Sequence, residues 1–492
     1  MRVTTLLRLA VAGNRIDHLR TVLTVLSSGL AAVALLAAAT VGSIEGDVAY
    51  ASKLIAERGL RPGVTVALIM LSLPVLALAG QCIRLGAPAR DRRLAAIRLS
   101  GATPGQAVLI ASAETVVAGL AGAVLGFGGF LAARSGVHRT NAEGLPVLPT
   151  DVLPAPSTIA AILLAVPLLA GLIGAGLLRR VVISPLGVVR RTRKRGPRPW
   201  PVVLIIAGQA LFAFPMRQAE LSIEVGWSMV ISGAVLSALG VVLGTGWIAH
   251  TCGRLLHRYG RRPAMLLAGR QLLADPWTGS RTLAALLASV LVGAVALGLR
   301  ALFETENRAS AAYEKQLSEP PSPDFATSRD FIFDTIDLIM VGVGIAMAVA
   351  SAGVLVTLAE NIVARRRTYA ALTAVGVPRR TLSEAVLWHT LAPVPPAVLL
   401  ALAAGVSLAR HFETEVSVGG SVAYVCDAAC QAGSGQAVAQ ATPGGPVTLA
   451  VPVPMEMLAW LGGGALLAML AVVGLGLLVL RSSTDLEELR AG

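Results

Sequence analysis

The residues that usually carry enzymatic chemistry are few in this sequence and lack the spacing that such chemistry needs. The phosphate-binding loop of an ATPase requires a glycine directly before its lysine, and none of the three lysines, Lys53, Lys194 and Lys315, has one. The six histidines form no HExxH pattern or comparable metal-ligand spacing. We therefore expect no catalytic, cofactor-binding or metal site in this chain, and no enzymatic activity of its own.

Two ionisable residues lie inside long apolar runs. Glu114 lies in the run 105–133 and His389 in the run 383–409, and the two residues are 275 positions apart. An ionisable side chain within a membrane is a candidate for transport or coupling, and a hydrogen bond to a neighbouring helix is the structural alternative. Because the offset of 275 also relates other parts of the chain, Glu114 and His389 are a candidate pair of intramembrane polar positions.

Two acidic residues at the start of an apolar run and two cysteines outside the runs are interpreted without a transport role. Asp334 and Asp337 lie at the start of the run 331–359, where we expect water to solvate them. Cys426 and Cys430 lie outside the apolar runs, in a stretch rich in Gly, Ser and Pro. A close pair outside the membrane is more often oxidised than bound to a metal, so we expect a disulfide between them.

The elements that position these residues follow from a strongly apolar composition. Of the 492 residues, 55% are hydrophobic and 14% are charged, and the mean hydropathy is +0.73. No water-soluble domain needs that much apolar surface, so we predict an all-α, polytopic membrane protein with about ten spans of roughly 20 residues or more. In the third span, Gly122 and Gly126 permit a close approach of another helix. The predicted spans are 21–43, 62–85, 105–133, 157–178, 200–216, 228–250, 282–303, 331–359, 383–409 and 455–480.

The distribution of basic residues predicts the orientation of these spans. With the N-terminus inside, 30 of the 41 lysines and arginines lie in inner segments, and each inner segment carries more of them than the outer loop that follows it. Basic residues accumulate on the cytoplasmic side of membrane proteins. We therefore predict a multi-pass protein of the bacterial plasma membrane with both termini in the cytoplasm. The net charge of +13 then faces anionic lipid head groups rather than nucleic acid.

An arginine-rich connector follows the second predicted span, and a similar one follows the eighth. Residues 90–106 and 365–381 share a basic start, a short helix-forming run of Ala and Leu, and a glycine with a proline soon after it. At the offset of 275, Gly101 aligns with Gly376. This pattern predicts a short helix at the mouth of two spans, ended by a glycine turn.

Further repeated segments indicate that the chain is built twice. Residues 6–21, before the first span, are similar to residues 267–282, before the seventh, and both are expected to be surface helices. The tail ending at Arg190 is similar to the tail ending at Arg490. The predicted segments are a first four-helix half (1–190), a link of two spans (191–262) and a second four-helix half (263–492).

These repeated motifs resemble those of the FtsX-like permease family, the membrane subunits of MacB-type (type VII) ABC transporters. The connector sequence RLAAIRLSGA at 93–102 fits the family's pattern. The sequence TYAALTAVGV at 368–377 fits it with Thr373 where the first copy has Arg98. The tails that end each predicted half are also similar to those of the family.

The resemblance implies that each connector forms a coupling helix that docks on a separate ATP-binding subunit. ATP and magnesium would bind in that partner, whose closure would move the spans. An ABC engine needs two ATP-binding subunits, and this chain has two connectors. We therefore expect one copy of the chain with two such subunits and no need for a homodimer. The expected coupling residues are Arg92, Arg93, Ile97, Arg98, Gly101, Arg366, Arg367, Leu372 and Gly376.

The function that the resemblance implies is export or extraction of a hydrophobic or amphipathic substrate, such as a lipid, a peptide or an antibiotic. A signalling or regulatory module driven by the same kind of ATPase is the alternative, and a secondary transporter without an ATPase is a third. The outer loops after the first and seventh spans have only about 18 and 27 residues between the predicted span ends. They are too short for the large outer domain of many relatives, so a pump that bridges the periplasm is not expected.

Overall fold

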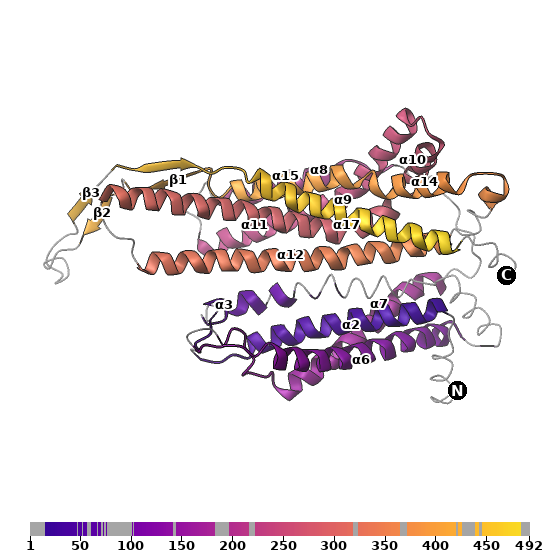
Figure 1. Cartoon of the computed structure of the whole chain (residues 1–492), viewed down its shortest axis with the longest axis horizontal. Helices are drawn as coiled ribbons and strands as arrows, with labels where there is room; N and C mark the ends of the chain where they lie inside the picture. Colours follow the sequence, from indigo (N-terminus) through magenta and orange to yellow (C-terminus); the bar gives the residue numbers. More distant parts are fainter. Residues whose placement is uncertain are drawn as a thin grey trace.

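The computed structural model is a bundle of long helices lying nearly side by side, with short strands at one end (Figure 1). Among the described residues, seven helices are long and apolar enough, by length and composition, to cross a membrane, and two shorter apolar helices lie at 156–172 and 200–213. The structure describes residues 15–46, 48–51, 53–56, 61–65, 67–69, 72, 75, 101, 103–140, 144–182, 196–215, 222–317, 323–364, 371–419, 422–425, 438–441 and 445–483.

The helices divide into two bundles. In chain order their bounds are α2 (Arg15–Gly42), α3 (Lys53–Ala56), α6 (Pro104–Gly136), α7 (Pro156–Val182), α8 (Trp200–Ala213), α9 (Ile223–Tyr259), α10 (Pro263–Ala274), α11 (Pro276–Leu317), α12 (Pro323–Ala364), α14 (Arg379–Leu391), α15 (Val394–Arg410) and α17 (Met455–Ser483). Helices α2, α6 and α7 pack together as the first bundle, and α11, α12, α15 and α17 form the second.

The first bundle is held by close backbone contacts between α2 and α6. An added Cβ atom on Gly122 would stand 2.3 Å from the carbonyl oxygen of Val25, and one on Gly126 would stand 2.4 Å from that of Gly29. Lipid tails are as apolar as the side chains, so helices in a membrane associate largely through such tight packing. The predicted close approach at Gly122 and Gly126 is therefore confirmed.

The second bundle contains the largest hydrophobic core, which includes the fully buried Leu286, Leu287 and Met469. The two linking helices, α8 and α9, pack on this bundle through α11 and α15. A polar contact fixes them there. The side-chain amide of Gln209 in α8 donates to the Ser237 hydroxyl of α9 at 3.2 Å and to the Ala404 carbonyl oxygen of α15 at 3.0 Å.

The second bundle extends well beyond the length of a membrane span at the end that carries the strands. Helices α11 and α12 have 42 residues each, which is about 60 Å of helix, whereas hydrocarbon needs about 30 Å. The loop expected after the seventh span is thus mostly helix, because α11 continues to Leu317 and α12 begins at Pro323. This segment is polar but rich in Glu and Ala, which favour helix as strongly as apolar residues do.

Strands form in the stretch between α15 and α17. Two antiparallel pairs occur, β1 (Glu415–Val418) with β4 (Val447–Ala450), and β2 (Val422–Val425) with β3 (Val438–Ala441). The β1–β4 pair packs against α11, where Gly419 adopts φ +84° and an added Cβ atom would stand 2.2 Å from the Tyr313 ring. The sequence suggested only a Gly- and Ser-rich stretch here, so these strands were not anticipated.

The first bundle has a small ordered cap beyond the ends of α2 and α6, made of residues 44–46, 48–51, 53–56, Arg61, 137–140 and 144–152. The side chain of Arg61 is 4% exposed, and it donates hydrogen bonds of 2.7–3.1 Å to backbone carbonyl oxygens. The acceptors are Ile44, Gly46, Ile55 and Ala56. Because several carbonyl dipoles surround it, the guanidinium is satisfied without a carboxylate partner among the described residues. Arg61 thus holds the chain after α2 in a fixed shape.

Tyr50 joins the two parts of this cap. Its hydroxyl donates to the carboxylate of Asp151, whose oxygens lie 2.9 and 3.1 Å away. The Ala51 N–H also donates to the carbonyl oxygen of Pro146 at 3.0 Å. Burial and the hydrogen bond to Asp151 raise the pKa of Tyr50 to about 12. The segments that follow α2 and α6 therefore pack as one unit.

The predicted all-α, polytopic membrane class is confirmed by these helices and their apolar lengths. The predicted fifth span is the 14-residue α8, too short to cross hydrocarbon alone. The predicted span 62–85 and residues 1–14 of the first surface segment lie largely or wholly outside the described residues. The boundaries at 190 and 262 stay a prediction.

Candidate coupling site

The second connector ends in a glycine turn directly before α14. Residues 371–374 are helical, the Gly376 N–H donates to the carbonyl oxygen of Thr373, and the Val377 N–H donates to that of Leu372, both at 3.0 Å. Gly376 has φ +99°. These two bonds and a left-handed glycine make a Schellman motif, which ends a helix in a defined direction.

The side chains of this turn divide into anchors and one exposed residue. Leu372 and Val377 are half-buried and pack against the large core of the second bundle, the apolar contact that often accompanies a Schellman motif. Val375, between them, is 85% exposed. Single exposed apolar residues are common, but this one sits on a turn whose backbone is fixed from both sides. Its side chain therefore stands in open space at the end of the connector.

The first connector ends in the same backbone conformation. Gly101 has φ +95°, and α6 begins three residues later. Thr103 and Gln106 form a capping box: the Thr103 Oγ accepts from the Gln106 N–H at 3.3 Å, and the Thr103 N–H donates to the Gln106 side chain at 3.0 Å. The predicted glycine turns are therefore present at both Gly101 and Gly376.

The helices around the two connectors begin at equivalent positions. Helix α6 begins at Pro104 and α14 at Arg379, which is the offset of 275 that relates the two glycines. This spacing supports the two-half organisation, which we treat below as part of a proposal.

The structure describes only some of the predicted coupling residues. The structure places Gly101, Leu372 and Gly376 in the turns described above. The sequence analysis did not single out Val375. Its one signal in the sequence is that an apolar residue stands where the first connector has Ser100. The predicted residues that lie outside the described residues are Arg92, Arg93, Ile97, Arg98, Arg366, Arg367, Cys426 and Cys430.

Glu114 and His389 occupy equivalent positions but lie far apart. Each is the eleventh residue of its helix, α6 or α14, and each side chain is half-buried. Figure 1 shows α6 and α14 on opposite sides of the molecule. Each residue therefore belongs to its own bundle, and a role for either in transport stays a prediction.

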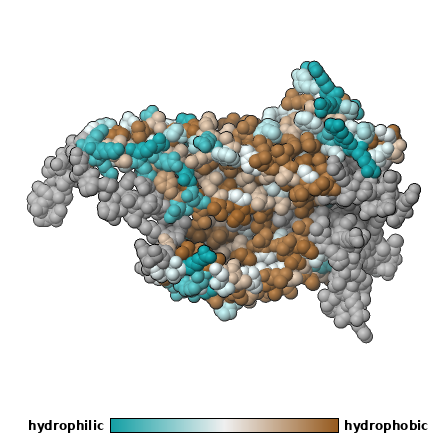
Figure 2. Space-filling view, viewed as in Figure 1, coloured by the Kyte–Doolittle hydropathy of each residue, from teal (hydrophilic) through white to brown (hydrophobic). Residues whose placement is uncertain are grey.

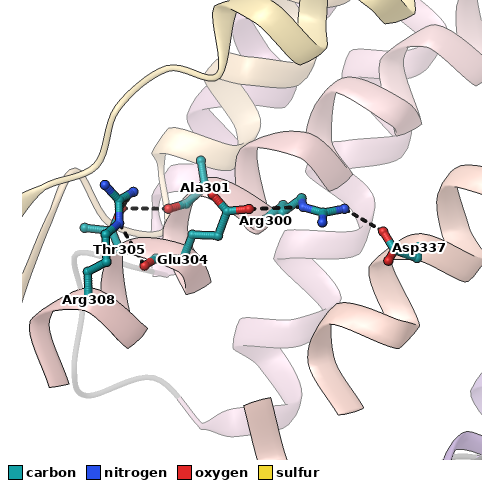
Figure 3. Close-up of polar contacts among 6 residues, drawn as sticks. All are labelled: Arg300, Ala301, Glu304, Thr305, Arg308 and Asp337. Atoms are coloured by element: carbon teal, nitrogen blue, oxygen red, sulfur yellow. Dashed lines mark hydrogen bonds and ion pairs between the residues drawn. The ribbon is translucent and has the colours of Figure 1, made fainter. Parts of the chain in front are cut away.

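An ion-pair network joins α11 to α12 in the part of these helices nearer the strands (Figure 3). The Arg300 guanidinium lies 3.1 Å from the Glu304 carboxylate, one turn further along α11, and 2.5 Å from the carboxylate of Asp337 in α12. The Arg300 guanidinium also stands 5.8 Å from the centre of the Phe333 ring. We expected Asp337 only to be solvated. It is 60% exposed and also forms this ion pair, which links α11 to α12.

The long apolar helices define the class as a multi-pass, all-α membrane protein. Residues 340–484 match the family model of the FtsX-like permease C-terminal domain. The matched part includes the second connector with α14, α15 and α17, together with most of the spanning part of α12. This part of the chain is therefore similar to the C-terminal domain of FtsX-like permeases. Among curated proteins, none matches the chain in sequence.

Proposed function

We propose that this protein is the membrane subunit of an ABC transporter. It would couple ATP hydrolysis in separate ATP-binding subunits to the export or extraction of a hydrophobic or amphipathic substrate, such as a lipid, a peptide or an antibiotic. The observation that carries this proposal is the second connector, which lies inside the matched family domain. It presents Val375, 85% exposed, on a turn whose flanking side chains pack on the core.

The proposed coupling runs from each connector into its bundle. ATP and magnesium bind in the partner subunits, and closure of those subunits pushes on the connectors. In the second half, Leu372 and Val377 would transmit the force on the connector to the hydrophobic core. From there α11 and α12, tied together by Arg300 and Asp337, carry it outward to the strands. The arginines of both connectors are proposed to contact the acidic or polar rim of the docking surface.

The proposed orientation places the connectors and both termini in the cytoplasm and the strands outside. The charge distribution supports it, because 30 of the 41 basic residues then face inward. Reporter fusions after Arg190, Arg262 and Gly492 should all give cytoplasmic signals. An external signal at any of the three positions would contradict both the orientation and the two-half organisation.

The proposed assembly is one copy of this chain with two ATP-binding subunits. It is supported by the equivalent turns at Gly101 and Gly376, since each connector can meet one subunit. The test is native mass spectrometry of the complex purified through a tag on this chain, combined with an ATP hydrolysis assay. We expect a 1:2 complex whose hydrolysis exceeds that of the isolated ATP-binding subunits. Two copies of the chain per ATPase pair would contradict the stoichiometry, and no association at all would contradict the function.

The alternative is a regulatory module in which the same motion drives an outer partner instead of transport. The observation that favours it is the outer extension of α11 and α12, with the β1–β4 pair packed on α11. Reconstitution separates the two functions. A transporter moves or releases its lipid or peptide substrate in vesicles that contain only this chain and its ATPase, whereas a regulatory module hydrolyses ATP there without moving any substrate.

A further inference from the structure

A strongly basic hairpin leaves the bundle near the start of α14. Helix α9 continues to Tyr259, the chain turns at Gly260, and α10 runs back from Pro263 to Ala274. Residues 254–274, here called the basic hairpin, contain five arginines and no acidic residue. All five arginines are exposed, namely Arg254, Arg258, Arg261, Arg262 and Arg270.

The basic hairpin is rigid because small residues let its two helices touch. An added Cβ atom on Gly253 would stand 2.8 Å from the Leu272 Cβ, and one on Gly269 would stand 2.9 Å from the His257 backbone nitrogen. The base of the hairpin also packs against Trp388 of α14. The arginines are thus held on a fixed support rather than on a free loop.

The arginines of the basic hairpin are not neutralised by acidic side chains in the described part of the chain. None of its five arginines forms an ion pair with a described residue, and Arg258 only lies over the ring of Tyr259, 5.6 Å from its centre. Five uncompensated charges on one rigid element create a positive field that favours an anionic partner.

The direction of the basic hairpin indicates which anionic partner this is. In Figure 1 the segment around α10 projects sideways from the bundle, across the long axes of α11 and α17. In Figure 2 its tip is hydrophilic and stands next to the broad apolar surface of the helices. Membrane-spanning helices run roughly along the membrane normal, so an element that leaves sideways at their end lies over the leaflet surface. A subunit that docks on the connectors lies beyond the helix ends instead.

We propose that the basic hairpin binds the anionic head groups of phospholipids in the leaflet at the connector end. Guanidinium groups pair with phosphate through two parallel hydrogen bonds, and an anionic leaflet attracts each basic residue near its surface. Tyr259 is 66% exposed and Leu255 is 51% exposed. Such side chains suit the boundary between head groups and acyl chains.

The test uses the full chain, purified in mild detergent without any ATP-binding subunit. Native mass spectrometry counts bound lipid as dioleoylphosphatidylglycerol or dioleoylphosphatidylcholine is added. The hairpin variant is Arg258→Gln/Arg261→Gln/Arg262→Gln. The control variant, Arg139→Gln/Arg308→Gln/Arg410→Gln, removes the same charge from exposed residues nearer the strands. We expect the hairpin variant to bind phosphatidylglycerol about tenfold more weakly than wild type, while the control and phosphatidylcholine binding do not change.

A charge-preserving variant covers the case in which the glutamine variant folds poorly. Arg258→Lys/Arg261→Lys/Arg262→Lys keeps the field and should retain most of the preference for phosphatidylglycerol. Unchanged preference in a folded glutamine variant would overturn the proposal, as would equal losses in the hairpin and control variants. If the glutamine variant kept its lipid preference but, in a separate binding experiment, lost affinity for an ATP-binding subunit, the hairpin would instead be a protein contact. Because the assay contains no ATPase, its failure leaves the proposed function intact.

Discussion

Gly122 of α6 and Val25 of α2 lie so close that a Cβ atom on Gly122 would stand 2.3 Å from the Val25 carbonyl oxygen. Any side chain there must push the two helices apart. We expect Gly122→Ala to destabilise the protein by about 1–3 kcal/mol, measured by thermal or denaturant unfolding in detergent. The control is Gly128→Ala in the same helix, where nothing lies within 4 Å of an added Cβ. Equal effects of the two variants would contradict the packing seen here.

The glycine turns give a test of coupling that is separate from packing. Gly101 and Gly376 have no neighbour within 4 Å of an added Cβ, but their φ angles of +95° and +99° strain any β-branched residue. We expect Gly101→Val and Gly376→Val to insert normally and to uncouple ATP hydrolysis from transport. Gly376→Asn should be milder, because asparagine tolerates this conformation.

The coupling experiment compares ATP hydrolysis with substrate movement in reconstituted vesicles. Gly105→Val is the control, since Gly105 lies four residues from Gly101 with open space and no positive φ. If both turn variants coupled like wild type, the turns would have no role in transmitting motion.

Val375 and Leu372 should respond differently to the same substitution. Val375→Ser changes an 85% exposed side chain, so folding should be unaffected while the affinity for the ATP-binding subunit falls by about tenfold. Leu372→Ser removes a core contact and should lower stability. Val137→Ser, an exposed valine that follows α6, is the control for binding. Unchanged affinity in Val375→Ser would show that the partner does not contact this turn.

Ionisation of Tyr50 should destabilise the cap of the first bundle at high pH. Its pKa in the folded protein is about 12, raised from 10.0 mainly by burial and then by the hydrogen bond to Asp151. A raised pKa means that the neutral form is favoured by folding. The stabilisation is therefore complete below about pH 10 and is lost as the pH rises through 12. Ultraviolet titration of wild type minus Tyr50→Phe should show one tyrosine that ionises near pH 12, and Asp151→Asn should lower that value. A difference spectrum centred near pH 10 would contradict the buried contact.

The sequence by itself determined the features that depend on short stretches of chain. A run of apolar residues enters hydrocarbon whatever its neighbours are, so composition and length predicted the polytopic class. The turns at Gly101 and Gly376 were equally predictable, because a helix end followed by glycine is a local choice of φ and ψ. The repeat was visible for the same reason, as two local patterns at one offset.

The tertiary structure alone decided which surfaces meet. In a chain so rich in Gly and Ala, most helix faces are similarly apolar, and the periodicity that marks a buried face in water is weak. The packing of α8 and α9 on the second bundle, through Gln209, could not be read from such a pattern. Contacts between distant residues, such as Arg300 with Asp337 or Arg61 with its four carbonyl oxygens, leave no local signal either. The exposure of Val375 follows from the same cause, because only the position of the core shows which side chains of a turn face away from it.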